Sequence, residues 1–365
     1  MVTLEELVPQ DHLLRAIDRH IDFEFIREST APMYCENNGR PAIDPVLLFK
    51  MLFIGYLFGV RSERQLVKEV QVNVAYRWFL GLNLTDKVPD ASTFSQNRRR
   101  RFEGTDIEQL IFDEIVEQAL EQGLIGGKAL YTDSTHLKAS ANKNRHSTHE
   151  VAIAPMAYLD ELNEAIEVDR QAHGKKPLKA KAIQQETKPT KVSDTDPDAG
   201  YMVRDKKPEG FFYLDHRTVD GKHGLITDTH VTPGNINDAR PYLDRLDRQC
   251  NRFQLNPIKV GLDAGYNTAT ICHGLVKRGI DGVVVYKRPH SPVGRLKRRH
   301  FTYDPAADEY RCLQGEALPY ATTNREGYRE YKSNPKVCKD CPLLDQCTRS
   351  RNHQKVMVRH VWEAD

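Results

Sequence analysis

Two strand-like runs of this sequence end in an aspartate: Lys128-Ala-Leu-Tyr-Thr-Asp133 and Ile258-Lys-Val-Gly-Leu-Asp263. A carboxylate at the end of a buried strand is costly unless a cation meets it there. Two such carboxylates brought together suit a pair of divalent metal ions, as in enzymes that transfer phosphoryl groups. Taken singly, each aspartate is more often a turn or helix-cap residue. Their pairing within one sheet is what favours a metal site.

The pattern around these runs indicates an α/β fold with a mixed sheet. The expected elements, in order, are a strand at 128–133, strands at 211–214 and 224–231 joined by a turn near 220–221, a helix at 238–250, a strand at 258–263, a helix at 268–277 and a strand at 282–287. Both aspartates then lie at C-terminal strand ends, where α/β sheets place ligands.

The first part of the chain, 1–125, is predicted to be a helical domain. Asp44-Pro45 is typical of a helix start, and Ser62-Glu-Arg-Gln65 and Thr105-Asp-Ile-Glu108 have the spacing of capping boxes. The α/β core is expected at 126–300, with an insert at about 139–205. In that insert we expect an amphipathic helix at 149–173 and a mobile linker at 174–200. A Cys-rich segment, 301–365, leaves the core incomplete.

Composition leaves the partner open. The chain of 365 residues has 53 Lys and Arg against 51 Asp and Glu, so overall charge gives no argument for nucleic acid. No signal peptide is visible at the start, and the most apolar stretch, 46–58, is too short to span a bilayer. The sequence therefore predicts a soluble, cytoplasmic protein.

Several blocks, taken in order, resemble bacterial insertion-sequence transposases of the DDE type. In the N-terminal part these are Pro41-Ala-Ile-Asp-Pro-Val-Leu-Leu and Val88-Pro-Asp-Ala-Ser-Thr-Phe-Ser-Gln-Asn-Arg-Arg. In the core they are Tyr131-Thr-Asp-Ser-Thr-His, Asp194-Thr-Asp-Pro-Asp-Ala-Gly, His216-Arg-Thr-Val-Asp-Gly-Lys-His-Gly and Gly261-Leu-Asp-Ala-Gly-Tyr-Asn. Each block alone is weak, but their order along nearly the whole chain is specific.

The resemblance implies a helical N-terminal domain and an RNase H-like catalytic core. It implies that Asp133 and Asp263 are catalytic residues that share Mg²⁺ (or Mn²⁺) ions. The reaction would be cleavage and strand transfer of double-stranded DNA at the terminal inverted repeats of the element, into target DNA. Assembly as a homodimer on those ends is expected.

One part of the family pattern is missing. The family carries a third acid, a glutamate, on a helix after the last core strand, and that spacing is not found after Tyr286. Glu330, in Tyr328-Arg-Glu-Tyr-Lys332, has the wrong spacing and is expected to be a surface residue. We therefore expect a C-terminally truncated chain with little or no activity. Two alternatives remain: a two-metal nuclease or resolvase, and an inactive DNA-binding remnant.

Four of the seven cysteines are grouped late in the chain, at Cys312, Cys338, Cys341 and Cys347. A C-x₂-C pair with two further cysteines is typical of a structural tetrahedral Zn²⁺ site. Reduced structural thiols and an iron–sulfur cluster are the alternatives.

Two basic runs are candidate phosphate-binding segments: Arg98, Arg99, Arg100 and Arg101 in the first domain, and Lys287, Arg288, Arg295, Lys297, Arg298 and Arg299 after the last strand. Such runs are usually solvated faces. In a chain of near-zero net charge, clusters this dense favour contact with DNA phosphates.

Overall fold

The computed structural model describes residues 3–34, 42–152, 159–179, 187–203, 208–286 and 293–363. The chain divides into two compact units, Met1–Leu124 and Ile125–Asp365. Each unit has its own apolar core, and each is described by itself. None of the helices in these ranges is long and apolar enough to cross a membrane.

The first unit is helical. Its elements are α1 Leu4–Leu7, α2 Leu13–His20, α3 Phe25–Thr30, η1 Ala31–Met33, α4 Pro45–Leu57, α5 Glu63–Val72, α6 Val74–Phe79, α7 Ala91–Asn97, the π-helical turn η2 Arg98–Phe102, and α8 Ile107–Glu121. The apolar helix α4 supplies Leu48, Met51 and Ile54 to the centre of the core.

Local capping explains where these helices begin. Asp44 accepts a hydrogen bond from the backbone of Val46 at the start of α4, and Ser62 accepts one from the backbone of Gln65 at the start of α5, so both predicted helix starts are confirmed. The Gln65 side chain donates to Glu69, so the capping box at Ser62 is incomplete. The predicted capping box at Thr105 is wrong. The Thr105 hydroxyl instead donates to the carbonyl of Phe102, and α8 begins without a side-chain cap.

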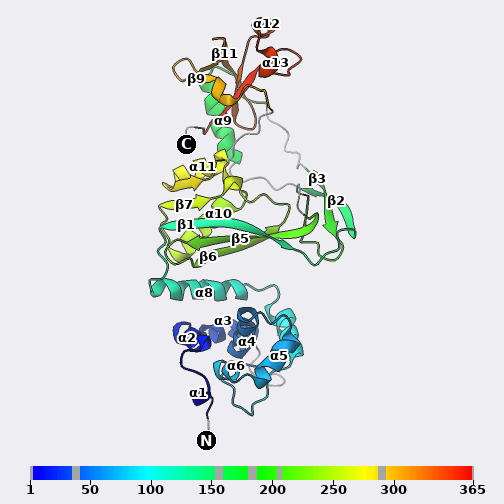
Figure 1. The fold of residues 1–365 in the computed structure, drawn as a ribbon, viewed down its shortest axis with the longest axis vertical. Helices are drawn as coiled ribbons and strands as arrows, with labels where there is room; N and C mark the ends of the chain where they lie inside the picture. The colour runs from blue at the N-terminus through cyan, green and yellow to red at the C-terminus, as the bar shows by residue number, and fades with distance from the viewer. Residues whose placement is uncertain are drawn as a thin grey trace. The chain divides into compact units, whose positions relative to one another are not determined.

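The second unit is built on a mixed sheet (Figure 1). Its strands are β1 Ala129–Lys138, β4 Gly200–Met202, β5 Gly210–Asp220, β6 Ile226–Pro233, β7 Lys259–Leu262 and β8 Asp281–Val284. β5 is antiparallel to β1, while β7 is parallel to β1 and β8 is parallel to β7. β6 pairs with most of β5, and β4 pairs with the beginning of β5.

Two helices connect the parallel part of this sheet. α10 Tyr242–Phe253 joins β6 to β7, and α11 Ala269–Lys277 joins β7 to β8. Leu246 of α10 and Ile271 of α11 pack with Leu130 and Val260 of the strands. Three antiparallel strands (β1, β5, β6) followed by two parallel ones (β7, β8), in the spatial order β6-β5-β1-β7-β8, form the predicted RNase H-like arrangement.

The remaining elements of this unit are a two-stranded antiparallel sheet, a helix, a separate five-stranded sheet and several short helices. They are β2 His146–Ala152 paired with β3 Thr187–Ser193, the helix α9 Leu159–Ala172, the sheet β9 Thr302–Asp304, β10 Glu309–Arg311, β11 Ala317–Thr323, β12 Tyr328–Lys332 and β13 Val356–His360, and the short helices η3 Ala264–Tyr266, η4 Arg298–His300, α12 Pro335–Cys338 and α13 Leu344–Cys347.

Two predictions for the insert are wrong in part. Of the expected helix at 149–173, residues 149–152 belong to β2, and α9 covers Leu159–Ala172. The expected linker at 174–200 contains strands β3 and the start of β4. β2 and β3 pair directly with each other, although α9 separates them in the sequence. Their backbone groups are therefore hydrogen-bonded, even though their side chains are mostly polar.

Candidate active site

Asp133 and Asp263 lie next to each other on adjacent parallel strands. Thr132 of β1 is in register with Leu262 of β7, so the following residue of each strand is one of the two aspartates. Both side chains are exposed. The Asp133 carboxylate accepts from the backbone of Ser134 at 2.7 Å, and the Asp263 carboxylate accepts from that of Gly265 at 2.8 Å. The pair therefore lies where β7 ends beside β1. The expected strand end at Asp133 is wrong, because β1 continues to Lys138 in register with β5.

The nearest strand cation does not neutralise this pair. Arg217 on β5 is in register with Asp133, but its guanidinium binds the Asp215 carboxylate at 2.6 Å. Within the described ranges, neither Asp133 nor Asp263 forms an ion pair. Two exposed carboxylates without a cationic partner are suitable oxygen ligands for a hard divalent ion.

A third carboxylate, which the sequence did not single out, lies beside Asp263. Asp238 follows β6 and precedes α10, and its Oδ2 lies near Gly265 together with both carboxylate oxygens of Asp263. No group of three His, Cys, Asp or Glu side chains in the described ranges is close enough to hold one ion. A Mg²⁺ ion usually takes only one or two carboxylates and keeps several waters, so the residues fit such an ion.

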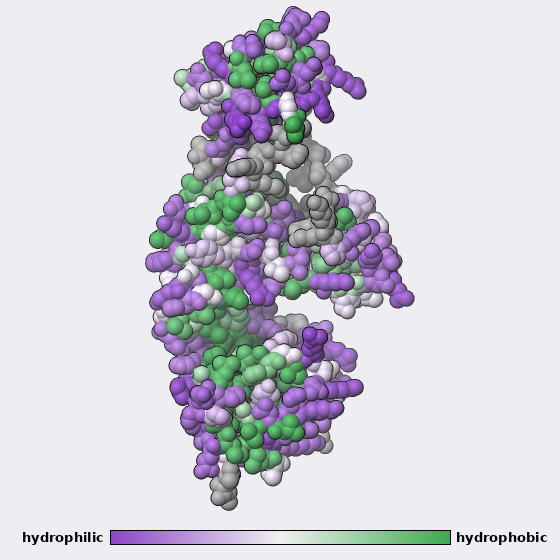
Figure 2. Space-filling model, viewed as in Figure 1, coloured by the Kyte–Doolittle hydropathy of each residue, from purple (hydrophilic) through white to green (hydrophobic). Residues whose placement is uncertain are grey.

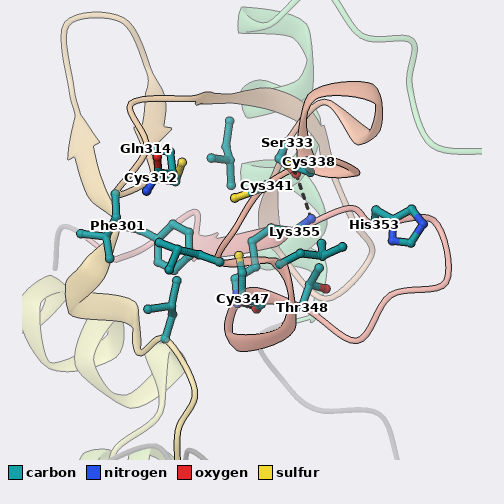
Figure 3. A pocket seen from close by; sticks show the side chains of 15 residues that line it. Phe301, Cys312, Gln314, Ser333, Cys338, Cys341, Cys347, Thr348, His353 and Lys355 are labelled. Atoms are coloured by element: carbon teal, nitrogen blue, oxygen red, sulfur yellow. Dashed lines mark hydrogen bonds between the residues drawn. The ribbon is translucent and has the colours of Figure 1, made fainter.

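The four late cysteines surround one cavity in the separate sheet. Cys312 follows β10, Cys338 ends α12, Cys341 comes next and Cys347 ends α13, and all four line a cavity of about 30 Å³ (Figure 3). Burial raises the pKa of the Cys347 thiol, Lys355 acts in the opposite direction, and the other three thiols raise it further. The structure brings the predicted cysteines together, but their side chains do not form a closed set of metal ligands.

The basic runs differ in how their side chains are used. Arg99 and Arg100 are exposed and form no ion pair with described residues, whereas Arg98 binds Glu63 at 3.6 Å. The Arg101 guanidinium lies over the Tyr34 ring at 4.4 Å. Lys287 and Arg288 lie outside the described residues.

In the second basic run, η4 carries Arg298 and Arg299, with Lys297 and Arg295 just before it. Lys297 and Arg299 are exposed, while Arg298 binds Glu363.

No third acid in the family position was found among the described residues. Glu330 lies on strand β12, where its carboxylate binds Lys332 at 2.8 Å. It is therefore held in a strand pair, and not on a helix that faces Asp133 and Asp263.

An RNase H-like core with an exposed aspartate pair defines a class of enzymes that act on nucleic-acid phosphodiesters. Two family models match the chain: a transposase domain (DUF772) over residues 2–100 and a transposase DDE domain over residues 311–365. These two matches, which together span less than half of the chain, support a DNA transposase. The second match covers the Cys-rich segment and neither aspartate.

Solved structures of transposases are similar only at low scores. A Mos1 transposase paired-end complex with left transposon end is 11% identical, covers 77% of this chain and 70% of its own, and gives a TM-score of 0.22. A piggyBac transposase synaptic complex with hairpin DNA is 11% identical, covers 84% and 54%, and gives 0.32. No curated protein matches. The fold assignment therefore rests on the strand order.

Proposed function

We propose that this transposase cleaves DNA at the ends of its element and joins those ends to target DNA, with Asp133 and Asp263 as ligands of divalent ions, Mg²⁺ or Mn²⁺. The observation that carries the proposal is the position of the two exposed carboxylates on neighbouring strands β1 and β7, without a cationic partner in the described ranges. Membership of the DDE type supports dependence on a divalent metal.

The geometry suits this chemistry because the two strands fix the carboxylates before any ligand binds. One oxygen of Asp263 is engaged by the backbone of Gly265, so the other remains available for a cation. When bound, divalent ions would activate water, and later a 3′-hydroxyl, for in-line attack on a phosphodiester. The exposure of both carboxylates leaves room for DNA to approach, and no covalent enzyme intermediate is needed.

Double-stranded DNA is the proposed partner, and exposed Arg99 and Arg100 are the strongest candidates for phosphate contact in the first unit. In the second unit Lys297 and Arg299 are likewise exposed and are candidates for phosphate contact.

We also propose a homodimer on DNA. On the helical unit, where Figure 2 shows apolar residues among polar ones, the end of α4 exposes Tyr56, Leu57 and Phe58. Action in the cytoplasm is part of the same proposal.

A structural Zn²⁺ at the cysteine cavity is the second proposed metal. Four thiols around one small cavity suit tetrahedral zinc once the side chains turn inward. Zinc measured by mass spectrometry in the purified chain is expected near one equivalent and lower in Cys341→Ser. Cys272→Ser, outside the cavity, is the matched control. Equal zinc in both variants, or none in the unaltered chain, would contradict this site.

The test of the main proposal uses duplexes that carry the terminal repeats of the element, with Mg²⁺ or Mn²⁺. Metal-dependent nicks at the repeat ends, and their joining to a plasmid, are expected for the unaltered chain. Asp133→Ala and Asp263→Ala should lose both products, while Asp281→Ala should keep them, because exposed Asp281 lies at the opposite end of the parallel strands.

Each alternative predicts a different result in this assay. Cleavage without joining would support a two-metal nuclease or resolvase. Salt-sensitive DNA binding without any metal-dependent cleavage would support an inactive DNA-binding remnant. Cleavage that survives Asp133→Ala or Asp263→Ala would show that the metal ligands are assigned wrongly.

A further inference from the structure

Asp238 and Asp263 face the same small space beside Gly265. A Cβ atom placed on Gly265 would lie 3.0 Å from Asp263 Oδ1 and 3.7 Å from Asp238 Oδ2. The glycine therefore leaves open a volume that two carboxylates border from different segments of the chain. Carboxylates that approach one another repel unless a cation lies between them.

Two buried polar atoms next to this space have no hydrogen-bond partner among the described residues. One is Asp238 Oδ1, and the other is the hydroxyl of Tyr266, whose residue is 0% exposed. Asp238 and Asp133 are close enough to act electrostatically on the Tyr266 hydroxyl, and the Ser134 side chain also lies near it. Buried polar groups are nearly always bonded, and a hydrated ion would supply partners for both.

A helix-capping role does not account for Asp238. The backbone N–H of Ala239 is bonded by the side chain of Asn237 at 3.0 Å, and α10 begins at Tyr242 without a side-chain cap. Among the described residues, Asp238 forms no ion pair. Its carboxylate is thus placed at the site without a structural contact that would explain it.

We propose that Asp238 is a further carboxylate ligand of the divalent-cation site. Asp263 is then shared between two ions, one held with Asp133 and the other with Asp238. Tyr266 donates to the water shell of the second ion or to Asp238. This assignment needs no more than two carboxylates for each ion, which suits Mg²⁺ and Mn²⁺. It rests on the proposed metal site at Asp133 and Asp263.

The test counts Mn²⁺ ions bound by the full chain, from the electron paramagnetic resonance signal of free Mn²⁺. The unaltered chain and the control Asp281→Asn are expected to bind two ions at the site. Asp238→Asn should bind the first ion normally and the second ion with an affinity at least tenfold weaker. Asp263→Asn should lose both bound ions. Mn²⁺ bound at the cysteine cavity is subtracted by repeating each titration in the Cys341→Ser background.

A thermal melt of the metal-free protein separates a ligand from a structural residue. If Asp238 is a ligand, it repels Asp263 when no ion is bound. Metal-free Asp238→Asn should therefore melt at the same temperature as the unaltered chain or higher. Added Mn²⁺ should raise the melting temperature of the variant less than that of the unaltered chain. A lower metal-free melting temperature with unaltered Mn²⁺ binding would show a structural role and overturn the inference.

The two proposals fail in different ways. If Asp238→Asn binds Mn²⁺ as Asp281→Asn does while Asp263→Asn is defective, Asp238 is not a ligand and the proposed function stands. A single ion bound by the unaltered chain would also overturn the role of Asp238. If Asp133→Asn and Asp263→Asn both bind Mn²⁺ normally, the proposed metal site itself is wrong.

Discussion

At the scale of single residues, the core of the second unit contains a histidine held in the neutral form. His216 on β5 is fully buried, and its ring lies 2.9 Å from the Thr232 hydroxyl on β6. Burial, helped by Arg245 and His230, lowers the pKa of His216 to about 4. Its low proton affinity depends on contacts that no local sequence pattern reveals.

This histidine predicts a loss of stability in mild acid. The unfolded chain takes up a proton below about pH 6.5, whereas the folded chain takes it up only near pH 4. The free energy of unfolding should therefore fall as the pH drops from about 6.5 to about 4, by at most about 1.4 kcal/mol per pH unit for this group. Urea denaturation at several pH values measures it.

His216→Gln is the matched variant for this prediction. It should show a shallower loss across the same pH range, even if it is less stable at pH 7. Some loss should persist, because burial also lowers the pKa of His230. An equally steep loss in the variant would show that other groups cause the pH dependence.

At the scale of elements, a buried ion pair joins the hairpin to α10. Arg245 on α10 binds Asp228 on β6 at 2.6 Å, and both side chains are 3% exposed. Arg248, one turn further along α10, binds the other carboxylate oxygen at 3.1 Å. These contacts fix the helix that follows Asp238, so they also support the candidate site.

Removing one partner of this pair should be strongly destabilising. Asp228→Ala leaves the Arg245 guanidinium buried without its counter-charge, which costs about 3–5 kcal/mol of unfolding free energy. Asp281→Ala, at an exposed position, should cost less than about 0.5 kcal/mol. Urea denaturation of the two variants measures the difference. A cost below about 1 kcal/mol for Asp228→Ala would mean that the pair contributes little.

The elements also show which structure could be predicted. The core strands, the β5–β6 hairpin and α11 follow from apolar runs, turn residues and the Thr268 cap, so the sequence indicated where they lie. It missed how far β1 and β5 extend, to Lys138 and Asp220. β2 and β3 were missed because their polar residues carry no alternation and their pairing joins segments more than 30 residues apart. Glu330 was expected to be a surface residue, and it lies half-buried on strand β12.

At the scale of the whole molecule, the aspartate pair was predictable and its third neighbour was not. Each aspartate follows an apolar run, and the order of elements places the two on adjacent parallel strands, although only Asp263 follows a strand end and β1 continues past Asp133 to Lys138. Asp238 lies in a connecting segment, where no period or motif marks it, and only the packing of Gly265 and Tyr266 shows that it reaches the same place. The cysteines were predictable because their spacing is itself the signal.

The most direct test of the central claim, that Asp133 and Asp263 hold a common metal site, is iron-directed cleavage of the protein backbone. Fe²⁺ bound in place of Mg²⁺, with ascorbate and peroxide, should cut the chain near residues 133 and 263, and excess Mg²⁺ should suppress both cuts. Asp263→Asn should abolish the cut near residue 133 as well as its own, while Asp281→Asn should change neither. A cut near residue 133 that persists in Asp263→Asn, or no Mg²⁺-suppressible cut at either place, would contradict the account.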